Sequence, residues 1–321
     1  MLLSVEHHFA FEYDGYISES FLEVRVQPKT TVHQTVHSFL LAVGPPSRLA
    51  RYVDWNDNVT HHFNITRFHD RIEVLARSVV STHPQAPAVA AVTDVPPFGG
   101  RPYALLDFLQ LGGPVPLTPA LRRFHRALKL PRGAGAGALV EAVGGQIHRR
   151  FTYRKDVTRY DSTTEDFLRL GAGVCQDFTH LALGSLRLSG IPCRYVSGYL
   201  HVDPAQQAEP AQSHAWIEFW SPSHGWIPFD PTHNRPVDER YIVVGHGRTY
   251  DDVPPNRGIY RGSAHERLQA EVRTSATTQR VPLAFQEGTQ PIDLPVFKEN
   301  PGRAGDYDLI VVEAAAQQQQ Q

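Results

Sequence analysis

Three residues of this sequence have the types that nucleophilic acyl transfer requires: a cysteine, a histidine and an aspartate. Cys175 stands directly ahead of an apolar helical repeat, which would place its thiol at the start of a helix. There the sulfur would face unpaired backbone N–H groups and the positive end of the helix dipole. Both stabilise a thiolate, so the sulfur would be nucleophilic near neutral pH. A nucleophile of this kind also requires a base and a group that orients the base.

The base and its orienting group are found in two short segments with alternating patterns. His214 lies in the first and Asp230 ends the second, and the turn-rich stretch between them suits a β-hairpin. If Trp220 pairs with Trp226 across that turn, His214 becomes a diagonal neighbour of Asp230 on one face, roughly 7–8 Å away. A slip of two residues would place them directly opposite each other, still on one face. A slip of one residue would separate them, but it would also mix the apolar faces. The imidazole would take the thiol proton, and the carboxylate would fix the imidazole tautomer.

Other residues compete for these roles. His180 is the histidine nearest to Cys175 in sequence, but five helical positions rotate it to about 140° from the starting face. Glu218 is a second carboxylate on the same hairpin face. We rank it below Asp230, which ends its strand, where a site is more open. Cys193 enters an apolar strand, so we expect it to be a small buried residue.

Each of these residues alone is more often structural than catalytic. A cysteine before a helix is usually a small buried residue, and a histidine or tryptophan on a strand usually belongs to the core. Only the combination of types, element positions and one shared face favours a thiol enzyme. A non-catalytic binding module remains the alternative at this point.

Composition excludes several other classes of function. The chain has 321 residues, of which 41% are apolar and 20% charged, and its net charge is −2, so no bulk field attracts nucleic acid or a membrane surface. The N-terminal stretch is too short and too weakly basic for a signal peptide, and no segment is long enough to span a membrane. We therefore expect a cytoplasmic protein. Two cysteines and 17 histidines form no zinc or calcium motif, so we expect no metal and no cofactor.

The pattern along the chain predicts four regions. Residues 1–82 contain short alternating strands and Asp-Gly or Asn-rich turns, which favour a β-sandwich-like domain. Residues 83–118 are rich in Pro and Ala and are predicted to be a linker and connecting segment. Residues 119–280 mix helical and strand patterns and should form a catalytic core, whereas residues 281–321, with a glutamine-rich end, should be a poorly ordered tail.

Four sequence blocks resemble the core of the transglutaminase-like superfamily, most closely its bacterial members. They are residues 173–180 (GVCQDFTH), 190–199 (GIPCRYVSGY), 214–218 (HAWIE) and 225–232 (GWIPFDPT). The region 1–82 is similar to the β-rich N-terminal domain of these proteins, and the resemblance covers roughly residues 2–275. It departs from the family pattern at Cys193, where relatives usually have alanine, and it does not explain the tail.

The resemblance implies an α+β fold: a papain-like core, with the nucleophile's helix packed on an antiparallel sheet, preceded by the all-β domain. It implies a Cys–His–Asp triad of Cys175, His214 and Asp230. The residues that we expect to contact the substrate are Gly173, Gln176, Trp216 and Tyr199.

The implied reaction is thiol-dependent acyl transfer on amide bonds of peptides or proteins, with a thioester intermediate. Release of the acyl group to water would make a hydrolase or peptidase, and release to an amine would make a protein-glutamine acyl transferase. The alternatives are a non-catalytic scaffold and a small-molecule acyltransferase. The oligomeric state is left open by the sequence.

Overall fold

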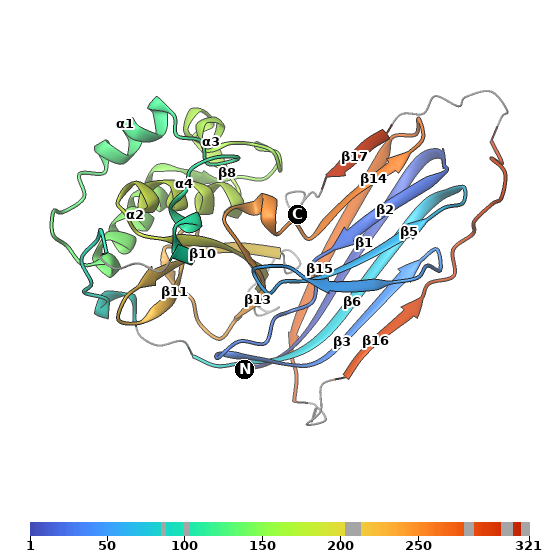
Figure 1. The fold of residues 1–321 in the computed structure, drawn as a ribbon, viewed down its shortest axis with the longest axis horizontal. Coiled ribbons are helices and arrows are strands. Elements are labelled where there is room, and N and C mark those ends of the chain that lie inside the picture. Colours follow the sequence, from blue (N-terminus) through green and yellow to red (C-terminus); the bar gives the residue numbers. More distant parts are fainter. Residues whose placement is uncertain (85–87, 99–102, 203–212, 279–285, 303–310, 316–321) are drawn as a thin grey trace.

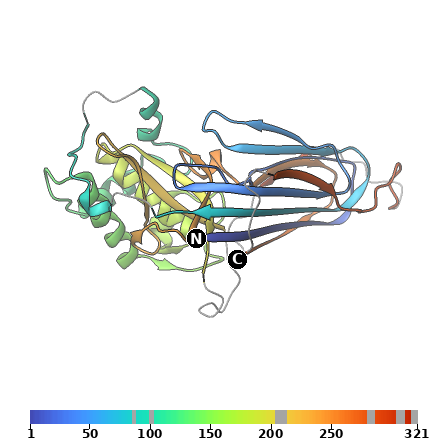
Figure 2. The ribbon, with the colours of Figure 1, turned by 90° about the horizontal axis from the view of Figure 1, so that it is seen from below.

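The protein has two parts, a long β-sandwich at one end and a mixed helical and sheet core at the other (Figures 1 and 2). The computed structural model describes residues 1–84, 88–98, 103–202, 213–278, 286–302 and 311–315. None of the helices in these ranges is both long and apolar enough to cross a membrane. The fold is α+β, as the sequence predicted.

The β-sandwich consists of two five-stranded sheets. The first has the order β15-β1-β6-β3-β16 and the second β17-β14-β2-β5-β4. Its strands are β1 (Leu2–Ile17), β2 (Glu19–Val24), β3 (Gln34–Gly44), β4 (Ala50–Val53), β5 (Val59–Ile65), β6 (His69–Thr82), β14 (Asn256–Arg261), β15 (Glu266–Ala276), β16 (Gln286–Pro291) and β17 (Val311–Ala315).

This topology corrects the domain boundaries expected from the sequence. β14 and β15 were assigned to the catalytic core, but they pair with β2 and β1 in the sandwich. β16 and β17 fall in the expected tail and nevertheless extend the same two sheets. The sandwich is therefore assembled from both ends of the chain, and the core is inserted between them. Residues 292–302 of the expected tail are also described, and Phe297 donates its backbone N–H to the carbonyl of Phe68 at 2.8 Å. Residues 281–285, 303–310 and 316–321 lie outside the described ranges.

The long strand β1 links the two parts of the molecule. Phe9 and Phe11, in the middle of β1, are buried between the two sheets of the sandwich. Leu3 and Val5, on the same face nearer its start, pack instead against Ile242 of the core. The period-2 alternation thus keeps one apolar face along the whole strand, and that face serves two neighbouring clusters.

The core is built on the antiparallel sheet β12-β11-β10-β9-β13. These strands are β9 (Cys193–Leu200), β10 (Ser213–Ser221), β11 (Gly225–Asp230), β12 (Arg235–Pro236) and β13 (Tyr241–Gly247), and the short pair is β7 (Thr152–Tyr153) and β8 (Ala172–Gly173). The helices are α1 (Pro119–Ala127), α2 (Ala136–Arg150), α3 (Thr164–Leu170) and α4 (Cys175–Leu188).

Helices α2 and α4 cover one face of this sheet. The apolar stripe of α4, including Phe178 and Leu181, packs with Ile217 and Phe219 of β10. Gly144 lets α2 approach β11 closely, because a Cβ there would lie 2.3 Å from Cε1 of Phe229. The result is the expected helix packed on an antiparallel sheet.

The expected linker packs firmly on the core. It contains the 3₁₀ helices η1 (Val89–Ala91), η2 (Tyr103–Leu105) and η3 (Asp107–Leu109). Val89, Val92 and Phe98 are buried in the same cluster as α4. The segment that is rich in Pro and Ala is therefore irregular in backbone but held against the core by buried side chains. Its residues 85–87 and 99–102 lie outside the described ranges.

The open edge of β13 is covered by two side-chain amides of the sandwich. Gln34 Nε2 donates to the carbonyl of Val243 at 2.8 Å, and Gln34 Oε1 accepts from the N–H of Val243 at 2.8 Å. Asn58 makes the same pair of bonds to His246, both at 2.8 Å. We call Gln34 and Asn58 the edge clamps. They satisfy backbone groups that an edge strand would otherwise leave unpaired.

Candidate active site

Cys175 is the first residue of α4, and its side chain is buried with only 7% of the residue exposed. Val174 precedes it in extended conformation, with φ −113° and ψ 179°, and is the N-cap. Its backbone N–H donates to Oδ2 of Asp177 at 2.8 Å, which closes the first turn. The thiol therefore has the expected position at the positive end of the helix dipole.

The hairpin of β10 and β11 brings His214 next to Asp230. Trp220 pairs with Trp226, which is one of the two registers that would keep His214 and Asp230 on one face. Nε2 of His214 donates to Oδ2 of Asp230 at 2.8 Å. The Cys175 side chain interacts with the same imidazole. Because Nε2 faces the carboxylate, Nδ1 is the ring nitrogen left for the thiol.

The electrostatic environment favours an ion pair between the side chains of His214 and Asp230. Burial by itself lowers the pKa of His214, but the Asp230 carboxylate, with a contribution from Cys175, outweighs burial and raises the pKa to about 10. Burial would raise the pKa of Asp230, yet the charge and hydrogen bond of His214 hold it well below its usual range. At neutral pH the pair is imidazolium and carboxylate, and an imidazolium stabilises a neighbouring thiolate.

Asp230 is fully buried and accepts hydrogen bonds at both oxygens. Besides His214, Oδ2 accepts from Nδ1 of His233 at 2.7 Å and from the hydroxyl of Tyr241 at 2.7 Å. Oδ1 accepts from the backbone N–H groups of Thr232 at 2.8 Å and of His233 at 3.1 Å. The carboxylate orientation is thus fixed by the turn after β11 and by the first residue of β13.

Trp216 fills the space between the imidazole and Tyr241. Its ring stacks on His214 with centroids 6.2 Å apart and meets Tyr241 edge-on at 5.3 Å. The indole crosses β9 at Gly198, where a Cβ would lie 2.6 Å from Cη2 of Trp216. Trp216 is fully buried, and its ring packs against the imidazole of His214.

Comparison with known proteins identifies the family to which this chain belongs. Residues 132–231 match the transglutaminase-like superfamily, and residues 3–81 match the bacterial transglutaminase-like N-terminal region. An uncharacterized protein of Mycobacterium leprae is 34% identical over 267 residues, which cover 81% of this chain and 93% of that protein. The chain belongs to the transglutaminase-like superfamily.

Two further relatives of this transglutaminase-like protein carry descriptive names. A protein-glutamine gamma-glutamyltransferase of Pseudomonas aeruginosa is 31% identical over 122 residues, 35% of this chain and 18% of that protein. A candidate cysteine protease from Cytophaga hutchinsonii has the same fold, with a TM-score of 0.72 at 18% identity, covering 98% of this chain and 97% of that chain. The Cytophaga structure shares the papain-like core and the N-terminal β-domain with this chain.

Two of the expected substrate contacts have internal roles instead. A Cβ on Gly173 would lie 2.4 Å from Oδ2 of Asp177, so the glycine makes room for that carboxylate. Asp177 also accepts from Oγ1 of Thr158 at 2.7 Å, and burial raises its pKa to about 6. Gln176 is buried and donates from Nε2 to the carbonyl of Tyr160 at 2.8 Å, which ties the preceding loop to α4.

Tyr199 is not brought to the transglutaminase-like site. It is buried with Leu3, Val5 and Ile242 where the sandwich meets the core, and its hydroxyl lies 3.0 Å from Nδ1 of His7. The reason is strand parity. His214 lies opposite Gly198, so the next residue, Tyr199, projects from the other face of the sheet.

The competing residues that we ranked lower are also placed elsewhere. Nε2 of His180 accepts the backbone N–H of Tyr250 at 3.1 Å, and burial lowers the pKa of His180 to about 3. Glu218 accepts from Nε of Arg194 at 2.6 Å in a separate buried cluster. Cys193 is fully buried, which raises the pKa of its thiol, and both cysteines are free.

Sequence reasoning missed four residues around the triad: Asp177, His233, Arg235 and Tyr241. Asp177 had a local signal, because an acidic residue at the third helical position is typical of a capping interaction. His233 follows the β11 turn and could have been considered from its spacing to Asp230. Tyr241 had no signal in the local pattern, since β13 reaches Asp230 only through the order of strands in the sheet.

Three of the site residues could in principle share a metal ion. One ligand atom from each of His214, Asp230 and His233 lies within 4.8 Å of the others. In the structure both imidazoles direct an N–H at the same carboxylate oxygen. A metal ion would have to replace two protons, one of them on an imidazole with a strongly raised pKa.

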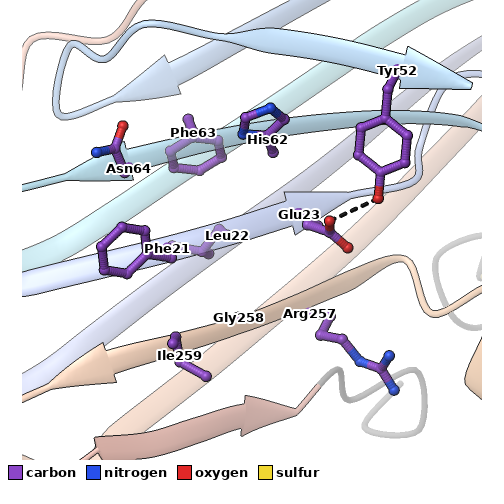
Figure 3. A pocket seen from close by; sticks show the side chains of 10 residues that line it. All are labelled: Phe21, Leu22, Glu23, Tyr52, His62, Phe63, Asn64, Arg257, Gly258 and Ile259. Carbon is purple, nitrogen blue, oxygen red and sulfur yellow. Dashed lines mark hydrogen bonds between the residues drawn. The ribbon is translucent and has the colours of Figure 1, made fainter.

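A separate open pocket of about 610 Å³ lies on the second sheet of the sandwich (Figure 3). Its walls come from β2, β4, β5 and β14, with Phe21 and Ile259 side by side and Tyr52 hydrogen-bonded to Glu23 at 2.7 Å. None of the residues that line it belongs to the triad, so this pocket is distinct from the place where chemistry is expected.

Proposed function

We propose that the protein is a cysteine acyl-transfer enzyme that acts on amide bonds of peptides or proteins through Cys175, His214 and Asp230. The observation that supports this most directly is the 2.8 Å hydrogen bond from Nε2 of His214 to Oδ2 of Asp230, with the Cys175 side chain interacting with the same imidazole. The imidazolium and the carboxylate have the charge states that the reaction requires, and Cys175 lies at a helix N-terminus.

In the first half-reaction the Cys175 thiolate attacks the amide carbonyl carbon. Backbone N–H groups of the first turn of α4, including that of Cys175, stabilise the negative charge that develops on the carbonyl oxygen. The imidazolium of His214 then gives its Nδ1 proton to the leaving nitrogen as the C–N bond breaks. An amine or ammonia departs, and a thioester remains on Cys175.

In the second half-reaction an amine or water attacks the thioester carbon. Neutral His214 takes one proton from the attacking group, and the C–S bond breaks to restore the thiolate and the imidazolium. Asp230 stays ionised throughout and stabilises each imidazolium state. An amine acceptor gives a new amide bond, whereas water gives a carboxylic acid.

Amide substrates are favoured by the names of two similar proteins. The Pseudomonas relative is a protein-glutamine gamma-glutamyltransferase, and the Cytophaga protein is a candidate cysteine protease. Both activities form a thioester from an amide. A non-catalytic scaffold would not need all three members of the triad, and this chain has Cys175, His214 and Asp230 together.

Selective alkylation tests the proposal. Limiting iodoacetamide at neutral pH should label Cys175 and leave Cys193, which serves as an internal control because it is fully buried. His214→Ala should abolish that preference, whereas His83→Ala, an exposed histidine of the sandwich, should preserve it. Label on Cys193, or equal label in wild type and His214→Ala, would overturn the activated thiol.

The substrate class is tested with a glutamine-containing peptide library, with and without a primary amine. Mass spectrometry distinguishes a new amide from a hydrolysed product, and Cys175→Ser is the control for background reaction. If Cys175 is selectively alkylated but neither product forms, amides of peptides are the wrong substrate.

A further inference from the structure

One oxygen of the triad aspartate is shared among three donors, and Tyr241 supplies the donor that comes from a distant strand. Its hydroxyl donates to Oδ2 of Asp230 at 2.7 Å and accepts from Nε of Arg235 at 3.0 Å. The guanidinium of Arg235 also lies over the Tyr241 ring, with Cζ 5.6 Å from the centroid. A charged donor behind the phenol polarises its O–H bond toward the carboxylate.

The Tyr241 ring also contacts the other side of the imidazole assembly. It meets Trp216 edge-on at 5.3 Å, and its centroid is 5.9 Å from that of His214. Tyr241 therefore contacts Asp230 through its hydroxyl and both aromatic neighbours through its ring. A shift of this one side chain would disturb both the base and its orienting group.

We propose that Tyr241, supported by Arg235, is a positioning residue that holds Asp230 and His214 in the geometry for proton transfer at Cys175. This rests on the proposed function of the triad. Tyr241 is 2% exposed and does not reach the substrate side, so it acts through Asp230. Burial and the Asp230 charge raise the pKa of the phenol, which keeps it a neutral donor.

The charged groups around Asp230 are consistent with this role. His214 and His233 contact it directly, and Arg235 faces it through Tyr241. His233 is held by its own turn, whereas Tyr241 begins β13 and connects the carboxylate to a different part of the sheet. The Tyr241 contact therefore constrains the carboxylate in a direction that the turn does not.

Tyr241→Phe keeps the ring and removes only the donor. The second-order rate of Cys175 alkylation by iodoacetamide at pH 7 should fall by about 5- to 20-fold. The acid limb of its pH profile should move to higher pH, because a loosely held Asp230 stabilises the imidazolium–thiolate pair less well. Tyr260→Phe is the matched control, since its hydroxyl bonds to the carbonyl of Ala264 in the sandwich.

A double-mutant cycle separates Tyr241 from a direct effect of Arg235. Arg235→Gln alone should slow alkylation by a smaller factor than Tyr241→Phe. If Arg235 acts through the phenol, the double variant should react no more slowly than Tyr241→Phe. If the rate in the double variant falls by the product of the two single-variant factors, Arg235 acts on the site independently of Tyr241. That result would overturn the supporting role assigned to Arg235.

The outcomes distinguish this proposal from the proposed function. An unreactive Cys175 in wild type overturns both. A reactive wild type with an unchanged Tyr241→Phe variant overturns only the positioning role. If Tyr241→Phe lowers the melting temperature and the folded fraction, but the folded protein keeps the wild-type profile midpoint, the residue is structural and the proposal is wrong.

Discussion

At the scale of single residues, the site depends on two buried charges that stabilise each other. His214 carries a raised pKa and Asp230 a depressed one, and each shift opposes what burial alone would do. An isolated buried charge is costly, so removal of either partner should be worse than replacement of both. The thiol benefits because the imidazolium is already present before substrate arrives.

The His214 pKa predicts how stability depends on pH. A histidine whose folded-state pKa is raised from 6.5 to about 10 contributes stability that is full below pH 6.5 and is lost as pH rises through 10. The free energy of unfolding of wild type should therefore fall between these pH values relative to His214→Gln, as measured by urea denaturation. His83→Gln should follow wild type at every pH, and parallel curves for wild type and His214→Gln would contradict the pKa shift.

At the scale of elements, the register of the β10–β11 hairpin determines whether His214 and Asp230 lie close enough to form a hydrogen bond. The parity of the β10 and β11 patterns was sufficient to place His214 and Asp230 on one face, because a slip of one residue would mix the apolar faces, but it left open a register shifted by two residues. The position of Cys175 followed from a helical repeat in the same way. Tyr241 could not be predicted, since strand order across β9 is not written in any local pattern.

The close packing of α2 on β11 at Gly144 can be tested by substitution, and the neighbouring Gly145 provides the control. Gly144→Ala should lower the free energy of unfolding by about 1–3 kcal/mol, because the added Cβ would lie 2.3 Å from a carbon of Phe229. Gly145→Ala meets only the flexible end of Arg149, at 3.1 Å, and should gain up to about 1 kcal/mol from helix propensity. Chemical denaturation of both variants measures the contrast; equal effects would mean that helix α2 shifts freely.

At the scale of the whole molecule, the sandwich and the core are joined through the edge clamps and a shared apolar cluster. The β-rich character of residues 1–82 was predictable from alternation, but the return of β14 and β15 was not. Their partners lie more than 200 positions away, and pairing over that separation leaves no local signal. Tyr199 was misplaced for a local reason, because it follows Gly198, the partner of His214, and so projects from the opposite face of the sheet.

The edge clamps predict coupling between the two parts. Gln34→Leu leaves the N–H of Val243 without its partner and removes one of the two donors to its C=O, the other being the N–H of Lys29 at 3.0 Å. The free energy of unfolding should therefore fall by about 1–3 kcal/mol. Gln290→Leu, an exposed glutamine of β16, should change it by less than about 0.5 kcal/mol. Amide hydrogen exchange should localise the loss of protection to β13, and a loss confined to β3 would argue against the clamp.

A truncation tests the corrected domain boundaries. Removal of residues after Pro255 deletes β14, β15, β16 and β17 and leaves β1, β2 and β3 without partners on one side. We expect the truncated chain to lose the cooperative transition of both sandwich and core, measured by circular dichroism and size-exclusion chromatography. A truncated chain that retains a monomeric, folded core would show that the core is independent of the sandwich.

The return of β15 to β1 also sets the order of events during synthesis. β1 is finished at Ile17, but its partner β15 emerges about 250 residues later, which takes roughly 10–50 s at ordinary rates of translation. Throughout that interval the longest strand of the protein has an exposed edge on the ribosome. The insertion of the core between the two halves of the sandwich therefore makes the nascent chain a natural client for chaperones that shield unpaired strands.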